Sequence, residues 1–354
     1  MIISRTPLRA SLAGGGTDFH EYYKSGYGAV VSTAISKYIY ITVNKMFDDK
    51  IRVSYSKTEL VDSIDQVQHN IIREALKIVG IEKAIEVVYM GDIPLGSAGI
   101  GLGSSSSLAI GVLNALYAYK GVHASAEQLA REACQIEIDI LSEPIGKQDQ
   151  YICAYGGFNF IQFNSDDTVF VDPVICPHET KESLNNKLML FYTGVERVSS
   201  SILQEQEQKT QVNLEHLDKL VILAQELKEN LIHNNIEAIG AILDEGWHYK
   251  RKLASKVSNT RIDEYYALAR KAGAAGGKIL GAGGGGFLLL YVDEKYQNEV
   301  RKALSHLVES PFEFEPQGSK IIYVNDQVPL SPMRLNGKKK ISFRDKNKTK
   351  EMAI

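Results

Sequence analysis

Residues 94–107 combine the residue types that bind a polyanion: alternating glycines, then four consecutive serines. Residues 84–90 before them have the composition of a strand, and residues 108–117 after them have apolar residues at helical spacing. A helix start offers unpaired N–H groups, and glycine lets an anion approach the backbone. The pattern favours a phosphate-binding loop over a flexible turn. The residues expected to contact the phosphate groups are Gly99, Gly101, Gly103, Ser104, Ser105, Ser106 and Ser107.

Two further glycine-rich runs, 14–18 and 281–286, suggest that backbone is brought close to another group at three places. The last run contains a GxGxxG pattern, but it leads directly into a strand-like segment, 287–292. A dinucleotide fingerprint lies between a strand and a helix, so that reading is disfavoured. No GxxxxGK[ST] pattern occurs, which excludes a Walker-type P-loop.

The elements that must position these loops can be read from periodicity. Adjacent groups of strands, rather than strict alternation with helices, predict an α+β fold in two lobes. A capping box opens the helix at Ser125, and Gly80 is a helix stop. Residues 1–13 show no regular pattern. Expected strands are 28–35, 38–43, 51–55, 84–90, 155–163, 188–192, 286–292 and 321–324, and expected helices are 67–79, 108–117, 125–141, 199–233, 236–256 and 296–307.

The composition narrows the function classes. The chain has 354 residues, enough for about two domains. The net charge of −3 offers no general attraction for nucleic acid or an anionic membrane. The odd count of three cysteines and the absence of a CxxC pair argue against a disulfide framework, so a cytoplasmic location is expected. No apolar run approaches the roughly 18 residues of a membrane span, and no signal peptide is recognisable.

The three glycine-rich motifs together, at 6–18, 94–107 and 278–287, resemble those of the GHMP small-molecule kinases in order and spacing. Within that family, segments 5–9, 13–18, 37–40, 55–59, 148–151 and 155–159 are most similar to the D-glycero-D-manno-heptose 7-phosphate kinases. L-fucose kinase-like members, or another sugar 1-kinase of the same fold, are the alternative.

The resemblance implies a GHMP kinase fold, with a ribosomal protein S5 domain 2-like N-terminal lobe that contains a left-handed βαβ unit and a ferredoxin-like C-terminal lobe. The expected domains are 1–178 and 179–336, followed by a basic, mobile tail at 337–354. The implied reaction transfers the γ-phosphoryl group of ATP, with Mg²⁺, to O1 of the heptose phosphate. The implied partners are the sugar phosphate and ATP, without nucleic acid or membrane, and a homodimer stays open.

The resemblance also assigns roles to single residues. Asp149 matches the catalytic carboxylate, and Arg9 matches an arginine that offsets phosphoryl charge. Glu137 matches the Mg²⁺ carboxylate, with Ser105 as the favoured serine ligand, although the serine run leaves a one-residue uncertainty. The eight histidines show no metal-ligand spacing.

Substrate binding is assigned to the first and third motifs. Asp18 matches a sugar-binding aspartate, and Gly15 and Gly16 stand where galactokinases carry Glu-His, which puts galactose in doubt. Cations for a second phosphate could come from Arg5, Lys147 or Arg197. The expected substrate residues are Asp18, Gly15, Gly16, Thr17, Arg5, Gly283 and Gly284.

Two other function classes stay open. A sugar and nucleotide sensor on the same fold would lack turnover, and the presence of Asp149, Glu137 and Ser105 argues against it. A nicotinamide dehydrogenase would use the GxGxxG run. ADP release with a sugar phosphate would exclude the sensor, and tight NADH binding without ATP binding would favour the dehydrogenase. The sequence does not distinguish heptose 7-phosphate from fucose or another hexose.

Overall fold

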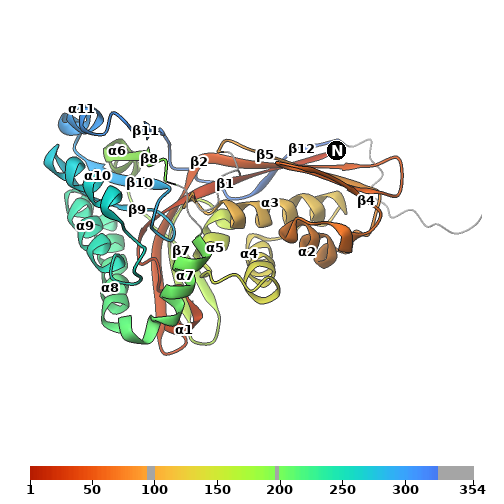
Figure 1. Ribbon diagram of the computed structural model, residues 1–354, viewed down its shortest axis with the longest axis horizontal. Helices are drawn as coiled ribbons and strands as arrows, with labels where there is room; N and C mark the ends of the chain where they lie inside the picture. The colour runs from red at the N-terminus through yellow and green to blue at the C-terminus, as the bar shows by residue number, and fades with distance from the viewer. Residues whose placement is uncertain (94–99, 196–198, 326–354) are drawn as a thin grey trace, which may run out of the picture.

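The computed structural model describes residues 1–93, 100–195 and 199–325. Within these residues the strands form an eight-stranded and a four-stranded sheet, arranged as two lobes (Figure 1). This is the expected two-lobed α+β fold. The first sheet contains β1 (Ile2–Ala13), β2 (Tyr27–Lys45), β3 (Ile51–Ser54), β4 (Thr58–Val61), β5 (Ile85–Gly91), β6 (Phe158–Asn164), β7 (Val169–Pro173) and β12 (Lys320–Val324). The second contains β8 (Leu188–Tyr192), β9 (Ala274–Ile279), β10 (Phe287–Val292) and β11 (Val308–Glu309).

The helices pack against the two sheets and fill the region between the lobes (Figure 1). They are α1 (His20–Tyr23), α2 (Asn70–Val79), α3 (Ser104–Tyr119), α4 (Ala126–Cys134), α5 (Gln148–Tyr155), α6 (His178–Lys187), α7 (Ser199–Gln208), α8 (Leu214–Ile232), α9 (Ile239–Lys250), α10 (Thr260–Lys271) and α11 (Glu294–Ala303). Short 3₁₀ segments lie at 64–66, 210–213 and 236–238, and a π-helical segment lies at Gln135–Ile140. None of the helices in the described residues has the length and apolar character needed to span a membrane.

β2 is one continuous strand where two were predicted. Its first half pairs with β6 and its second half with β5, and β1 lies against both halves. The polar residue Ser36 interrupts the hydrophobic pattern, which is why two strands were predicted. It lies at the point where the neighbouring strand changes from β6 to β5. There the backbone N–H of Ser36 donates to Glu313 O at 2.8 Å, which keeps the chain extended.

β1 was not predicted, because its buried positions are not all apolar. The strand pairs with β2 along its length and with β12 at Ile2–Arg5, and most of its residues are buried. The alternation is broken by Ser4, Thr6, Arg9 and Ser11, which are all buried. Pro7, which has no N–H to donate, lies where the β1–β2 register shifts.

Two local helix signals are confirmed. Gly80 adopts φ +71° after α2, and its N–H bonds back to Leu76 O, as a glycine helix stop does. The Ser125 side chain accepts a hydrogen bond from Gln128 N at 3.1 Å at the start of α4. The expected helix 125–141 is less regular than predicted, since its second half is the π-helical segment.

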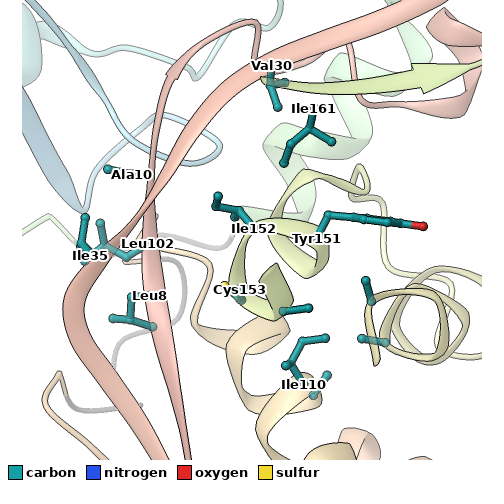
Figure 2. Close-up of a cluster of buried hydrophobic side chains, with 14 of the residues drawn as sticks. Leu8, Ala10, Val30, Ile35, Leu102, Ile110, Tyr151, Ile152, Cys153 and Ile161 are labelled. Atoms are coloured by element: carbon teal, nitrogen blue, oxygen red, sulfur yellow. The ribbon is translucent and has the colours of Figure 1, made fainter. Parts of the chain in front are cut away.

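A buried hydrophobic cluster holds α5 against the first sheet. Figure 2 shows Ile152 and Cys153 of α5 facing Leu8 of β1, with Ile110 of α3 beside them. These side chains are at most 2% exposed, and each fully buried Leu or Ile stabilises the fold by roughly 1.5–3 kcal/mol. The N-terminal residues of α5 are therefore fixed relative to β1.

The second sheet is buried on both faces, which explains the uninterrupted apolar run of β10. Leu288, Leu290 and Val292 pack in a core with residues of α10 and α11. The alternate residues Phe287, Leu289 and Tyr291 join the large core shared with α8 and α9. One sheet thus packs against helices on two sides.

The chain returns to the first sheet at its end, where β12 pairs with β1. The boundary expected between 178 and 179 stays a prediction. The expected tail at 337–354 lies outside the described residues.

The second and third glycine-rich segments cross with almost no space between them. A Cβ on Gly101 would lie 2.4 Å from Leu280 O, and one on Gly281 would lie 2.5 Å from the Cα of Gly101. Both residues also have positive φ, +83° and +69°. These glycines are required by the contact between the lobes.

We expect Gly101→Ala to destabilise the protein by about 2 kcal/mol or more, because the new Cβ meets a backbone carbonyl and the left-handed conformation is strained. Urea unfolding measures the change. Gly26→Ala is the matched control, since nothing lies within 4 Å of its added Cβ, and its stability should change by no more than about 0.5 kcal/mol. Equal stability of the two variants would contradict the crossing.

Candidate active site

A bidentate ion pair between Arg9 and Asp149 lies at the centre of the site. Arg9 Nε donates to Asp149 Oδ1 and Arg9 Nη2 to Asp149 Oδ2, both at 2.6 Å. The Arg9 side chain is 4% exposed and that of Asp149 is 22% exposed. Burial by itself disfavours the charged guanidinium, but the charge and hydrogen bonds of Asp149 outweigh it and raise the pKa of Arg9. The guanidinium therefore stays charged, and the Asp149 side chain is still partly open to solvent.

Arg9 also fixes the second glycine-rich segment. Its Nη1 donates to Gly101 O at 2.6 Å, and its backbone N–H donates to Leu102 O at 3.0 Å. A Cβ on Gly103 would lie 3.0 Å from the Arg9 side chain and 3.3 Å from Asp149 Oδ2. Gly103, at φ +73°, is the residue before α3. The start of α3 is therefore held directly beside the ion pair.

The four serines at the start of α3 have different surroundings. Ser107 is fully buried, and its hydroxyl donates to Pro7 O at 3.0 Å, so it ties α3 to β1. Ser105 and Ser106 hydrogen-bond with the carboxyl group of Glu137. Ser104 lines a cavity with Ser105. Of the predicted run, Ser107 is directed into the fold, and Gly99 lies outside the described residues.

Glu137 is a buried carboxyl group, 1% exposed, on the π-helical segment. Burial raises its pKa from 4.5 to about 7, although hydrogen bonds from Ser105, Ser106 and Gln150 oppose the shift. Gln150 Nε2 donates to Glu137 Oε2 at 2.7 Å. A carboxylate and a hydroxyl are hard oxygen ligands, and nucleotide-bound Mg²⁺ uses few protein ligands beside phosphate oxygens. The Glu137–Ser105 pair fits that ion.

No group of three or more His, Cys, Asp or Glu side chains converges into a metal site in the described part of the chain. A cage made of protein ligands alone is therefore absent there. The donor set of Glu137 and Ser105 is one that needs further oxygens from a bound phosphate chain.

A cavity of about 570 Å³ opens from the start of α3. Its lining includes Arg9, Asp149, Ser104, Ser105 and Glu137. It also includes residues to which the sequence analysis gave no role: Tyr55, Gln68, His69, Asn70 and Ile71. The volume lies in the range of small-molecule sites.

His69 in this cavity has a buried ring nitrogen, Nδ1, without a partner in the described residues. Burial lowers the pKa of the imidazole, so its neutral form is favoured. Its ring meets that of Tyr55 edge-on at 4.8 Å between centroids. A neutral histidine and a tyrosine suit a flat, uncharged ring system. The only sequence signal was the resemblance quoted for 55–59.

On the other side of the ion pair, the Asp18 carboxyl group is already hydrogen-bonded to other residues of the protein. It accepts hydrogen bonds from Gly16 N at 3.0 Å and from the side chain of Gln148 at 3.0 Å. Burial raises the pKa of Asp18, and the charge of Asp149 adds to the effect. A Cβ on Gly146 would lie 2.0 Å from Asp18 Oδ2, so this glycine lets the chain pass the carboxylate.

The other residues of the first motif are also structural in part. Thr17 is fully buried, and its hydroxyl donates to the carbonyl oxygens of Gly14 and Ala29 at 2.9 and 3.0 Å. Gly16 lines a small cavity beside Asp18. A Cβ on Gly15 would lie 3.5 Å from Ser11 Oγ and 3.7 Å from Lys250 Nζ, so this glycine leaves the space open.

The remaining predicted substrate residues are scattered. Arg5 lies over the Tyr38 ring and pairs with Glu315 at 3.4 Å, so the structure does not bring it to a cavity that Arg9 lines. Gly283 and Gly284 pack against Val257, with Gly284 N donating to Val257 O at 2.7 Å. Arg197 lies outside the described residues.

Two lysines that the sequence analysis missed lie at this side of the site. Lys250, at the end of α9, donates to Gly281 O at 2.5 Å and lines the small cavity. Lys278 on β9 donates to Leu12 O at 3.2 Å. Burial lowers the pKa of Lys278 well below its usual range, and the charges of Lys250 and Arg9 add to that effect. Lys278 is the first residue of the third motif but was given no role, and Lys250 lies outside all three motifs.

A third cavity, of about 610 Å³, adjoins the small one at Asp18, Phe19 and Ile145. Lys147 lines it, donates to Asp167 Oδ1 at 2.8 Å and lies over the Tyr23 ring. Its other lining residues of the Asp, Glu, His and Arg types are Asp18, His20, Glu21, Arg131, Asp139, Glu143, Asp167 and Glu207. Acidic side chains outnumber basic ones in this lining. Of the candidate cations Arg5 and Lys147, Lys147 is the one that lines a cavity shared with Asp18.

Comparison with known proteins identifies relatives across nearly the whole chain. The model of the GHMP kinases N terminal domain matches residues 65–157, and that of the GHMP kinases C terminal matches residues 227–309. The D-glycero-alpha-D-manno-heptose 7-phosphate kinase of Campylobacter jejuni is 31% identical over 320 residues, covering 86% of this chain and 93% of that protein.

Two further relatives define the range of similarity. The bifunctional fucokinase/GDP-fucose pyrophosphorylase of Arabidopsis thaliana is 26% identical over 68% of this chain, which matches 24% of that protein. The crystal structure described as a D-glycero-D-manno-heptose 1-phosphate kinase from Bacteroides thetaiotaomicron is 26% identical, with a TM-score of 0.77, covering 92% of this chain and all of that one.

We expect the affinity for Mg·nucleotide to rise with pH up to about 7, because the ion binds the ionised Glu137, whose pKa is raised to about 7. The rise is at most roughly tenfold per pH unit, since one proton is released. The stability of the free protein changes with pH in the opposite direction to the nucleotide affinity. A carboxyl whose folded pKa is raised loses its contribution to stability as pH rises from 4.5 through 7. Calorimetric titration from pH 5.5 to 8 measures the nucleotide affinity, and urea unfolding over the same range measures the stability.

Glu137→Gln should remove both pH dependences relative to the unsubstituted protein, and the nucleotide's own titration cancels in that comparison. Asp139→Asn is the matched control, because Asp139 is exposed on the same segment and does not line the cavity of about 570 Å³, which we call the nucleotide-sized cavity. A Glu137→Gln protein with an unchanged pH profile of binding would exclude Glu137 from the ion site.

Proposed function

The chain belongs to the GHMP kinases, and on that premise we propose that it transfers the γ-phosphoryl group of Mg·ATP to O1 of D-glycero-D-manno-heptose 7-phosphate. That it is an ATP-dependent sugar kinase follows from the family and from the heptose phosphate kinase relative. The proposal adds the particular sugar and the position of transfer. The observation that carries it is the Arg9–Asp149 pair, which lines both the nucleotide-sized cavity and the small cavity beside Asp18.

The phosphate chain of ATP fits the start of α3. The N–H groups there and the positive end of the helix dipole stabilise anions, and Gly103 keeps side-chain atoms out of the way. When bound, Mg²⁺ would neutralise charge that develops on the phosphate oxygens. Ser105 and Glu137 are the residues that would hold it.

Arg9 and Asp149 act at the point of transfer. The carboxylate of Asp149 is held by Arg9 on one side, and its remaining lone pairs accept the proton of the sugar hydroxyl. The same guanidinium offsets negative charge on the group in transfer. Because both side chains are anchored, they need little reorganisation during the reaction.

A second candidate acceptor is an unphosphorylated sugar such as L-fucose. The acid-rich lining of the third cavity favours a neutral polyol over a phosphate, because carboxylates repel a second dianion. The heptose phosphate is preferred on the similarity to the heptose 7-phosphate kinase, which is the relative with 31% identity.

We also propose a cytoplasmic location, which is supported by three cysteines that are all free thiols. The thiols of Cys134 and Cys153 are buried, and burial raises the pKa of both well above the usual range. They are poor nucleophiles in that state. The oligomeric state stays open.

We expect ADP release from ATP to be fastest with D-glycero-D-manno-heptose 7-phosphate in a screen of free and phosphorylated sugars. Phosphorus NMR of the product should show an anomeric phosphate. Faster turnover of L-fucose or galactose would reject the heptose phosphate and keep the kinase. Turnover of none of the sugars would reject the proposed reaction.

Asp149→Asn should lower kcat by roughly 10²–10⁴, because the amide does not accept the hydroxyl proton. Nucleotide binding should change by no more than about threefold, since the proposed role of Asp149 is toward the sugar hydroxyl and not toward the nucleotide. Asp172→Asn is the control: its carboxylate is 55% exposed and pairs with Lys228 at 2.6 Å. Unchanged kcat in Asp149→Asn would refute the assigned role.

A further inference from the structure

In addition to Asp18 and Gln206, three polar side chains line the small cavity beside the Arg9–Asp149 pair. They are Ser11 of β1, Gln148 at the start of α5 and Lys250 at the end of α9. The cavity measures about 60 Å³, which is room for about two hydroxyl-sized groups. None of the three was expected from the motifs to contact the substrate. Each comes from a different element, so only the fold brings them together.

The Ser11 hydroxyl is buried without a partner among the described residues. The residue is 3% exposed. Other buried serines of this sheet and its covering helix are satisfied: Ser4 Oγ donates to Gly111 O at 2.7 Å and Ser107 Oγ to Pro7 O at 3.0 Å. A buried hydroxyl left unpaired is unfavourable and calls for an explanation. The open space at Gly15 lies next to this oxygen.

The Gln148 side chain has one satisfied and one unsatisfied end. Its Nε2 donates to Asp18 Oδ2 at 3.0 Å, while Oε1 is buried without a partner in the described part of the chain. A carboxylate only accepts hydrogen bonds, so the NH₂ group must face Asp18 and the amide cannot be turned around. The bond to Asp18 therefore leaves Gln148 Oε1 as a hydrogen-bond acceptor for a group in the cavity.

Lys250 supplies donors to the same space. Its ammonium group is a hydrogen-bond donor with three protons, and it also donates to Gly281 O. The residue is 5% exposed, and a Cβ on Gly15 would lie 3.7 Å from its Nζ. The cavity therefore offers a donor, an acceptor and a hydroxyl that does both.

We propose that Ser11, Gln148 and Lys250 form an acceptor subsite that binds the sugar hydroxyl groups next to the one that receives the phosphoryl group. A hydroxyl both donates and accepts, so a pair of neighbouring hydroxyls satisfies the whole set. A phosphate dianion has no proton to give to Gln148 Oε1 and leaves it unpaired. The subsite therefore reads the hydroxylated end of the acceptor. This inference rests on the proposed kinase function.

Ser11→Ala tests the subsite without disturbing the fold. The hydroxyl has no partner in the free protein, so its removal should leave the stability unchanged or slightly raised. With ATP and D-glycero-D-manno-heptose 7-phosphate, kcat/KM for the sugar should fall by about fivefold to twentyfold, and KM for ATP should stay constant. If L-fucose is the better acceptor of the unsubstituted enzyme, it replaces the heptose as the probe.

Ser4→Ala is the matched control on the same strand. It should lower stability, because a satisfied hydroxyl is lost, and leave kcat/KM for the sugar unchanged. Lys250→Met is a second variant, with Lys252→Met, at an exposed neighbouring position, as its control. Lys250→Met should lower kcat/KM for the sugar by at least about tenfold with ATP binding retained, because a charge-assisted hydrogen bond is removed.

Deoxy analogues of the acceptor sharpen the test. With the analogue that lacks the hydroxyl read by Ser11, the unsubstituted enzyme and Ser11→Ala should turn over equally. Equal kcat/KM of the two proteins with every acceptor would overturn the proposal, even though the kinase reaction stood. Absence of sugar turnover in the unsubstituted enzyme would instead reject the proposed function.

Discussion

The bidentate ion pair between Arg9 and Asp149 is the interaction on which the site depends. It joins residues 140 positions apart in the chain, and the third donor of Arg9 holds the carbonyl of Gly101. A buried guanidinium is tolerated only when it is paired and its protons are bonded. β1, α5 and the second glycine-rich segment must therefore come together in one arrangement. The folding of the first lobe and the assembly of the reaction centre are linked through this pair.

The contact between the lobes adds a second constraint, which is steric. Gly101 and Gly281 cross at a distance that leaves no room for a Cβ on either. The glycines of these segments are thus needed for close backbone approach and positive φ, and not for flexibility. Because Lys250 bonds to the carbonyl of Gly281, the second lobe supplies a cation to the acceptor side of the site.

Burial also decides the charge of the groups around the ion pair. It shifts Glu137 and Lys278 toward their neutral forms, while Arg9 stays charged because Asp149 faces it. In a medium of low polarity, charges and hydrogen bonds are stronger than in water. The unpartnered atoms of Ser11 and Gln148 lie in the same environment, where a bound hydroxyl gains most from meeting them.

Local features and the order of the motifs were determined by the sequence itself. The stop at Gly80, the cap at Ser125 and the buried run of β10 follow from neighbours along the chain, and the glycine-rich segments predicted the kinase family. The sequence did not show β1, because its buried polar residues hide the strand pattern. From the sequence, Arg5 was expected to bind the substrate, whereas in the fold it bonds to Glu315, 310 residues away.

Which side chains meet was decided by the tertiary structure. Arg9, Asp149, Ser105 and Glu137 come together as the motifs suggested, and their roles stay predictions. Thr17 and Ser107 bond to backbone carbonyls, and Asp18 is bound by Gln148. Ser11, inside the first motif, and Lys250, outside all three, had been given no role. Periodicity depends on residues a few positions apart, so a sequence encodes it directly. A hydrogen-bond partner depends on distances between elements far apart in the chain, and those distances exist only once the two sheets have packed.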